Sequence, residues 1–150
     1  SITDIKNASR RLKTKLASQG IELGLILVDY LQLCEAEGEN RQNEISKISR
    51  GLKQIARGLQ VPVLALSQLS RKVEERQNKR PMLSDLRESG SIEQDSDLVM
   101  FIYRDEYYHP DTAKTKTAEI IIAKQRGGAV GTVELFFDAS LTTFRDLEFK

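Results

Sequence analysis

The sequence predicts an α/β fold in which helices cover a parallel sheet and an antiparallel hairpin follows at the C-terminal end. Two short apolar runs, residues 23–28 and 61–66, end in polar residues, as buried parallel strands do. Between them, residues 45–59 place apolar side chains three or four positions apart, which indicates a helix. Two segments that alternate with period two, residues 117–126 and 131–137, flank a glycine pair and predict the hairpin.

Length and composition favour one globular domain. The chain has 150 residues, of which 39% are hydrophobic and 30% charged, and this balance excludes collagen-like, low-complexity and wholly disordered classes. A net charge of +1 gives no general attraction for nucleic acid, so a nucleic-acid site has to be local. Cys34 and His109 are the only residues of their kinds, which excludes a disulfide framework and favours a reducing compartment. No apolar run reaches the roughly 18 residues of a membrane span.

The first segment is expected to form an amphipathic helix. Ser1 or Thr3 is its candidate N-cap, and Gly20 marks its end. Its apolar residues stand three and four apart: Ile5, Ala8, Leu12 and Leu16. Because a helix lies between the two apolar runs that follow, these runs are expected to pair in parallel.

A long polar stretch separates this first half from the remaining strands. Residues 70–97 contain no strand-like run, and we expect a partly mobile loop with a short helix near residues 83–88. Loops of this length are usually functional or disordered. Residues 98–103 then predict a third buried strand before the hairpin. Three tyrosines near His109, Tyr103, Tyr107 and Tyr108, are expected to be packing residues.

Polar residues end both apolar runs of the predicted parallel pair. Asp29 follows the first, and a carboxylate at the carboxyl edge of a parallel sheet stands where such folds collect ligands and can hold hydrated magnesium. Ser67 and Gln68 follow the second run, at the same edge, where the amide can reach a phosphate or an attacking water. Simple capping residues would produce the same pattern, and both interpretations stay open.

Two further groups of residues could contact phosphates. Lys124 and Arg126 are two apart on a predicted strand, so both side chains are expected on one face, where they could stabilise phosphoryl charge or merely protect a sheet edge. Residues 84–91 offer one guanidinium, small hydroxyls and backbone amides near Gly90, which are groups that grip a nucleic-acid backbone without reading bases. A solvated loop is the alternative.

Taken in order, these stretches resemble the C-terminal motor domain of a DnaB-type replicative DNA helicase. Residues 25–33, LILVDYLQL, resemble the Walker B segment of this family, and residues 63–69, VLALSQL, its sensor strand. The DNA-binding loop of the family and its flanks resemble Arg80-Pro81 and residues 84–95, SDLRESGSIEQD. The likeness continues through three more stretches, residues 101–106, 120–126 and 131–133. It implies that residues 1–150 form part of a RecA-like P-loop NTPase core, from the Walker B segment to the C-terminal hairpin.

The resemblance implies roles at a nucleotide site that uses ATP and Mg²⁺. Asp29 would organise magnesium through water, and Gln68 would sense the γ-phosphate and couple it to the DNA loop. Lys124 and Arg126 would act in trans, as the arginine finger that completes the site of a neighbouring subunit. These four are the expected catalytic residues, and Asp29 and Gln68 are the expected cofactor-binding ones.

The resemblance also implies partners and a location. Arg87, Glu88 and Gly90 would contact the phosphate backbone of single-stranded DNA inside a homo-hexameric ring. Primase and a helicase loader would be the protein partners, as in a primosome. The location implied is the bacterial cytoplasm or the plastid stroma.

One part of the family pattern is missing. No G-x-x-x-x-G-K-[ST] motif occurs, so the phosphate cradle and its lysine are not in these 150 residues. We therefore expect roughly the second half of a motor domain, inactive alone. Alternatives are a non-catalytic single-stranded-DNA-binding or ring-assembly module, and a RecA-type recombinase, although residues 85–95 resemble helicases.

Overall fold

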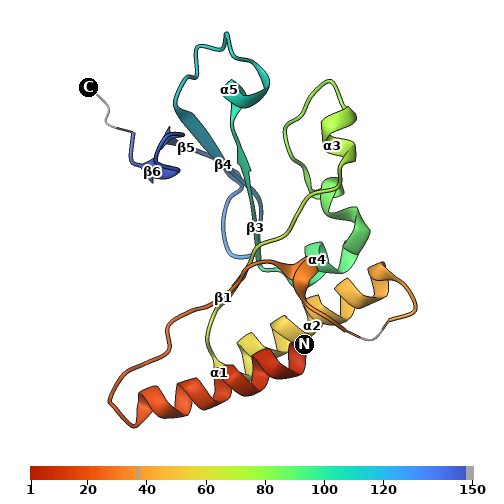
Figure 1. Ribbon diagram of the computed structural model, residues 1–150, viewed down its shortest axis with the longest axis vertical. Helices are drawn as coiled ribbons and strands as arrows, with labels where there is room; N and C mark the ends of the chain where they lie inside the picture. The colour runs from red at the N-terminus through yellow and green to blue at the C-terminus, as the bar shows by residue number, and fades with distance from the viewer. Residues whose placement is uncertain (37, 148–150) are drawn as a thin grey trace. The chain divides into compact units, whose positions relative to one another are not determined.

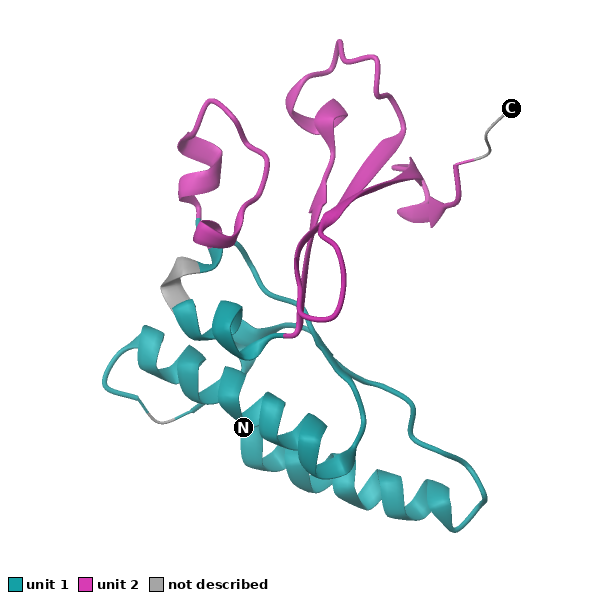
Figure 2. Ribbon diagram, turned by 180° about the vertical axis from the view of Figure 1, so that it is seen from behind, with its two compact units in different colours: residues 1–70, 86–96 teal, residues 71–85, 97–150 magenta. Residues whose placement is uncertain are grey.

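The structure, a computed structural model, describes residues 1–36 and 38–147, with the side chains of residues 87–89 outside that description. It contains two compact units (Figure 2). Unit 1 is Ser1–Ser70 with Leu86–Ser96, and unit 2 is Arg71–Asp85 with Asp97–Lys150. The chain therefore passes from unit 2 into unit 1 within the stretch that resembles a DNA-binding loop.

The two long helices of unit 1 begin and end at residues with clear capping roles. Helix α1 (Ile2–Ala17) has Ser1 as its N-cap, in a capping box with Asp4, which settles the choice between Ser1 and Thr3. Helix α2 (Arg41–Leu59) begins after Asn40, whose side chain accepts from the Asn43 amide at 2.9 Å. It ends at Gln60, whose left-handed φ of 52° stops the helix.

Strands β1 (Ile26–Val28) and β2 (Val63–Ala65) pair in parallel, so this prediction is confirmed. Their connection contains α2, which is labelled in Figure 1. Ile26 lies opposite Val63 in the register. The core of unit 1 gathers residues from β1, α2 and the short helix η1 (Leu31–Leu33). Its buried members are Val28, Leu31, Ile48, Leu52 and Ile55.

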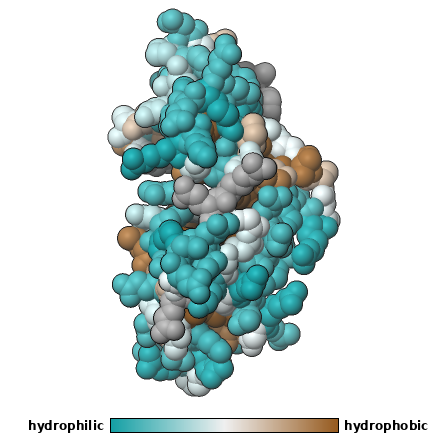
Figure 3. All heavy atoms as spheres, turned by 90° about the vertical axis from the view of Figure 1, so that its right-hand side faces the viewer, coloured by the Kyte–Doolittle hydropathy of each residue, from teal (hydrophilic) through white to brown (hydrophobic). Residues whose placement is uncertain are grey.

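The expectation that residues 23–28 form a strand covered on both faces is wrong for the described residues. Leu27 is 59% exposed, and Leu64, its register partner, is 40% exposed. Within the described part of unit 1, apolar packing therefore covers only one face of this pair. Patches of hydrophobic residues are visible among the mainly hydrophilic ones in Figure 3.

The polar stretch between the two halves contains more structure than its sequence predicts. The expected short helix is confirmed as η2 (Leu83–Ser89), a 3₁₀ helix. Two further helices, α3 (Lys72–Glu75) and α4 (Gly90–Asp95), were not predicted, because one turn or so is too short for a periodic pattern. No helix among the described residues is both long and apolar enough to cross a membrane.

Unit 2 is built on an antiparallel sheet of strands β3 (Leu98–Tyr103), β4 (Thr117–Gln125), β5 (Gly131–Asp138) and β6 (Thr143–Arg145), in that order. The predicted hairpin is confirmed as β4 and β5. The predicted burial of residues 98–103 holds for alternate side chains only, because β3 pairs antiparallel with β4 and exposes every second residue.

The tyrosines of unit 2 pack against one another, as expected. Helix α5 (Asp105–Tyr108) follows β3, and the Tyr103 and Tyr108 rings stack with centroids 5.8 Å apart. The Tyr107 ring meets Tyr108 edge-on at 5.0 Å.

Candidate functional site

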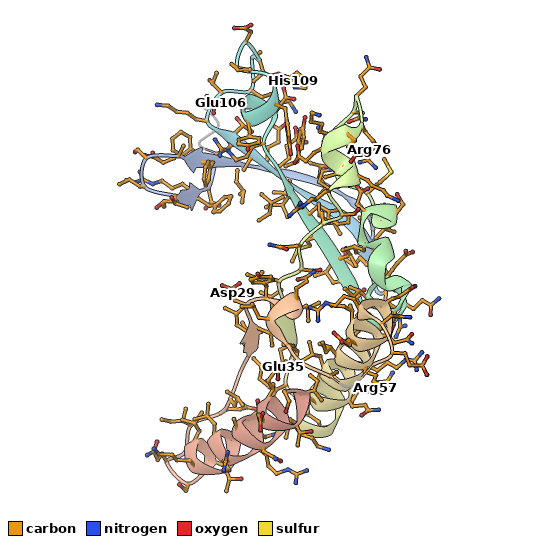
Figure 4. The ribbon with its side chains drawn as sticks, turned by 45° about the vertical axis from the view of Figure 1, so that its right-hand side comes forward. Asp29, Glu35, Arg57, Arg76, Glu106 and His109 are labelled. Atoms are coloured by element: carbon orange, nitrogen blue, oxygen red, sulfur yellow. The ribbon has the colours of Figure 1, made fainter. Side chains whose placement is uncertain are left out.

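Asp29 and Gln68 come from the same edge of the β1–β2 pair, as the parallel arrangement predicts. Backbone bonds extend the pairing beyond both strands: the Leu66 amide donates to the Val28 carbonyl, and the Leu31 amide donates to the Leu66 carbonyl, each at 2.9 Å. Asp29 lies between Val28 and Leu31, in the segment that joins β1 to η1 (Figure 4), and its side chain is exposed. The Asp29–Tyr30 peptide bond is cis.

The Gln32 side chain links these two segments, and sequence reasoning did not identify it. Its amide nitrogen donates to Ser67 Oγ at 3.2 Å and to the Gln68 carbonyl at 3.3 Å. In return, the Gln68 backbone amide donates to Gln32 Oε1 at 3.2 Å. Arg41 donates to the Gln32 carbonyl and pairs with Glu44 at 2.7 Å. The only signal for Gln32 was its place in the Walker B-like stretch.

The Asp29 carboxylate fits a cation that keeps its own waters. Among the described residues, no group of three or more His, Cys, Asp or Glu side chains could hold a metal ion. Asp29 is exposed and makes no hydrogen bond or ion pair within the described part of the chain. Magnesium commonly keeps several waters and uses one or two carboxylates together with the phosphates of a substrate. The exposed carboxylate of Asp29 thus fits the magnesium role expected for it.

Lys124 and Arg126 lie at the C-terminal end of β4. The strand ends at Gln125, so Arg126 lies in the turn, one residue beyond the observed strand. Lys124 lies opposite Val99 while Ile122 lies opposite Met100, which makes Ala123 the extra residue of a β-bulge, and this bulge precedes both cations. The expectation that the two side chains share one face stays a prediction.

Arg126 is held by an exposed partner at the end of its strand. Its amide donates to the Asp97 carbonyl at 2.8 Å, and its guanidinium pairs with the Asp97 carboxylate at 3.0 Å. More than half of each side chain is exposed. Exposed pairs of this kind contribute about 0–1 kcal/mol, so the guanidinium can exchange its partner readily.

The residues expected to contact DNA lie where the chain enters unit 1. Arg87 and Glu88 lie in η2, and their side chains are outside the described residues. Gly90 is the first residue of α4, and a Cβ added there would meet no described atom within 4 Å. The space beside its backbone is therefore open.

Helix α4, which begins at Gly90, is attached to α2 within unit 1. Ser49 Oγ donates to Asp95 Oδ2 at 2.8 Å, and Ser91 Oγ donates to Ser46 Oγ at 2.9 Å. Ile92 packs against the unit 1 core. Apolar packing and hydroxyl groups thus hold this side of the loop.

The segment before these residues is attached through ion pairs within unit 2. Arg76, labelled in Figure 4, donates to both oxygens of Asp85, at 2.7 and 2.9 Å. The Met82 amide also donates to this carboxylate, at 2.9 Å, and Asp85 is only 5% exposed. Arg80 pairs with Glu119 on β4. The sequence indicated only a polar loop with mixed charges.

Two groups near α5 titrate outside their usual ranges. Hydrogen bonds from Thr112, Tyr103 and His109 lower the pKa of Asp105 to about 2. Burial, together with a hydrogen bond to Glu74 at 2.7 Å, raises the pKa of Tyr108 to about 12. Because these groups are engaged with one another, they stabilise unit 2 and do not form an open site.

The described residues form an α/β fold in which a parallel strand pair is followed, at one edge, by an acid and a glutamine. The model of the DnaB-like helicase C-terminal domain family matches residues 1–146, and the chain belongs to that family. The resemblance predicted from sequence is thereby confirmed.

Individual relatives agree. The chain is 57% identical to the replicative DNA helicase DnaB of Geobacillus stearothermophilus and covers 32% of it, with 98% of this chain aligned. It is 58% identical to the replicative DNA helicase DnaC of Bacillus subtilis, with the same coverage of 98% and 32%. The chain thus spans about a third of the length of the curated relatives it matches.

Solved structures show the same fold. One of them, an ATPase domain, matches with a TM-score of 0.92 and 49% identity, over 99% of this chain and 52% of that one. A DnaB-like replicative helicase, described with its interactions with primase, also matches with a TM-score of 0.92 and 49% identity, over 99% of this chain and 36% of that one. The α/β ATPase-domain fold expected from sequence is confirmed.

Proposed function

We propose that this chain is the second half of the motor domain of a hexameric replicative DNA helicase, which hydrolyses ATP to translocate on single-stranded DNA and unwind the duplex. The observation that carries the proposal is the common edge of β1 and β2, where Gln32 joins the segment after Asp29 to Gln68. Membership of the helicase family supports it.

At this edge, Asp29 holds a magnesium ion through water and Gln68 senses the γ-phosphate of ATP. When bound, magnesium neutralises part of the phosphate charge. Gln68 offers a neutral amide, which both donates and accepts hydrogen bonds, and Gln32 holds its backbone. Loss of the γ-phosphate can therefore shift the segment after β1 and the segment after β2 together, because Gln32 links them.

Lys124 and Arg126 act on the nucleotide of the neighbouring subunit as its arginine finger. Developing negative charge in phosphoryl transfer is stabilised by a cation supplied in trans. The exposed pair with Asp97 favours this role, because giving it up for a phosphate costs little.

Arg87, Glu88 and Gly90 contact the phosphate backbone of single-stranded DNA. Open space beside Gly90 supports a close approach of a phosphate to the backbone there. Primase and a loader are the protein partners of the intact homo-hexamer, in a bacterial cytoplasm or plastid stroma. Without a G-x-x-x-x-G-K-[ST] motif, these 150 residues alone hydrolyse no ATP.

The test replaces Asp29 by Asn in the full-length protein that carries this chain. We expect the ATPase rate with single-stranded DNA to fall about 100-fold, because the amide no longer favours a hydrated cation. Glu35→Gln is the matched control, since Glu35 is an exposed carboxylate nearby (Figure 4), and it leaves the rate within about twofold. Equal effects of the two variants on the ATPase rate would contradict the proposed role of Asp29 in holding magnesium.

Mixed rings test the finger. Subunits with Asp29→Asn and subunits with Arg126→Ala are each inactive in uniform rings. Mixing them restores activity if Arg126 acts in trans, because some interfaces then combine an intact Asp29 with an intact Arg126. Failure of every mixture would place Arg126 in its own subunit's site. DNA-stimulated ATPase from the 150-residue chain alone would refute its inactivity, whereas DNA binding without any ATPase in the full-length protein would favour a non-catalytic binding module.

A further inference from the structure

We infer that Glu119 is a positioning residue that ties strand β4, which carries Lys124, to the segment leading into the DNA loop. This inference rests on the proposed function. It assigns a route, within unit 2, by which β4 influences the residues of the same subunit that are expected to contact DNA. These residues, Arg87, Glu88 and Gly90, are called the DNA loop.

Glu119 is a buried carboxylate with both oxygens engaged. It lies in the middle of the sheet and is 2% exposed. Arg80 donates to Oε2, and Lys114 Nζ donates to Oε1 at 2.8 Å. The ion pair with Arg80 is the main reason that the pKa of Glu119 is lowered. A buried charge of this kind is tolerated only with its partners in place, so the position of Arg80 is strictly determined.

Arg80 is held on a second side by an aromatic ring. Its guanidinium carbon lies 4.7 Å from the centroid of the Tyr103 ring. Tyr103 lies directly opposite Glu119 in the β3–β4 register. One cross-strand pair thus supplies both the carboxylate and the ring that hold Arg80.

The attachment continues from Arg80 to the end of the segment. The Arg80 carbonyl accepts from Arg76 Nη2 at 2.9 Å, and the same guanidinium holds Asp85 through both carboxylate oxygens. Asp85 stands two residues before Arg87 in the sequence. A continuous set of hydrogen bonds therefore runs from β4 to Asp85, close to the residues expected to contact DNA.

Lys114, the other partner of Glu119, makes no such connection among the residues that the structure describes. It also pairs with Glu134 at 2.6 Å, and Glu134 lies opposite Glu119 on β5. Both of these partners lie within the sheet, whereas the partners of Arg80 reach into Arg71–Asp85. Both cations neutralise the same buried carboxylate, which makes Lys114 a matched control for Arg80.

The experiment compares Arg80→Met and Lys114→Met in the full-length hexamer, with ATPase rates measured without DNA and at saturating single-stranded DNA. We expect Arg80→Met to reduce the stimulation by DNA at least about fivefold, the lower bound of a typical coupling between sites. The rate without DNA stays within about twofold for both variants, and Lys114→Met retains the stimulation. Arg80→Lys restores part of it.

A further variant separates this role from a direct contact of Arg80 with DNA. Glu119→Gln keeps the shape of the side chain and removes the charge that holds Arg80. It leaves the Arg80 guanidinium itself intact, so it removes no cation that could bind a DNA phosphate. It is expected to reproduce the loss of maximal stimulation, with an unchanged DNA concentration at half-stimulation. A raised half-stimulation concentration for Arg80→Met alone would overturn the inference in favour of a DNA contact.

The remaining outcomes are also decisive. If Arg80→Met and Lys114→Met lose stimulation equally, or if neither does, Glu119 has only a structural role. If Arg80→Met does not assemble, Glu119→Gln against Lys114→Met makes the same comparison. A wild-type protein without DNA-stimulated ATPase would refute the proposed function, which is a different result from a stimulated wild type with unaffected variants.

Discussion

The two sides of the candidate DNA loop are held by different interactions. The segment before it, Arg71–Asp85, is attached in unit 2 by ion pairs to buried carboxylates, Asp85 and Glu119. The helix after it, α4, is attached in unit 1 by serine hydroxyls and by the packing of Ile92. Among these contacts, the first side relies on ion pairs of buried carboxylates, and the second combines hydroxyl groups, one of them bonded to the Asp95 carboxylate, with apolar packing.

This difference has a physical consequence. A guanidinium paired with a carboxylate accepts one geometry, because both groups are planar and bidentate. Apolar packing is non-directional, and a single hydroxyl bond fixes fewer degrees of freedom than a bidentate pair. We therefore expect the segment before the loop to transmit a displacement and α4 to serve as the base against which the loop moves.

The largest effect is expected for Asp85→Ala in the full-length protein. This substitution leaves Arg76 and the Met82 amide without their acceptor, and we expect the local free energy of unfolding of Arg71–Asp85 to fall by about 3 kcal/mol. Hydrogen exchange of the amides in this segment measures it. Asp111→Ala, at an exposed aspartate, is the control and changes exchange by less than about 0.5 kcal/mol. A loss below about 1 kcal/mol for Asp85→Ala would remove the contrast between the two sides.

Acid is expected to weaken the same side selectively. The pKa of Glu119 in the folded chain is below its usual value of 4.5, chiefly because Arg80 donates to it. Its stabilising contribution is therefore complete above pH 4.5 and is lost as the pH falls through the folded pKa. Hydrogen exchange, corrected for its intrinsic pH dependence, should show Arg71–Asp85 opening in acid before α4 does. In Glu119→Gln this acid step disappears, and its persistence would assign the step to another carboxyl group.

The smallest effect is expected for Ser49→Ala on the other side of the loop. It removes one hydroxyl that donates to Asp95, and we expect the free energy of local unfolding of α4 to fall by about 1 kcal/mol, with Arg71–Asp85 unaffected. Gln54→Ala, at an exposed position of the same helix α2, is the control. An effect as large as that of Asp85→Ala would show that hydroxyl bonds and not packing dominate this side.

The sequence by itself determined the elements that depend on neighbouring residues. The apolar period of residues 45–59 predicted α2, and two apolar runs around it predicted the parallel pair, because a connecting helix leaves few other arrangements. The same logic placed Asp29 and Gln68 at one edge, where the structure has them. Their roles, and those of Lys124, Arg126, Arg87, Glu88 and Gly90, remain predictions.

Other features were decided only by tertiary structure. An apolar run such as Leu98–Tyr103 does not reveal its partner strand, so its antiparallel pairing with β4 had to come from the fold. The bulge at Ala123 also depends on that partner. Gln32 meets Gln68 and Arg80 meets Glu119 across 36 and 39 positions of the sequence. A long-range contact between polar residues leaves no periodic pattern in the sequence. Such a residue needs a hydrogen-bond partner only after folding has removed it from water.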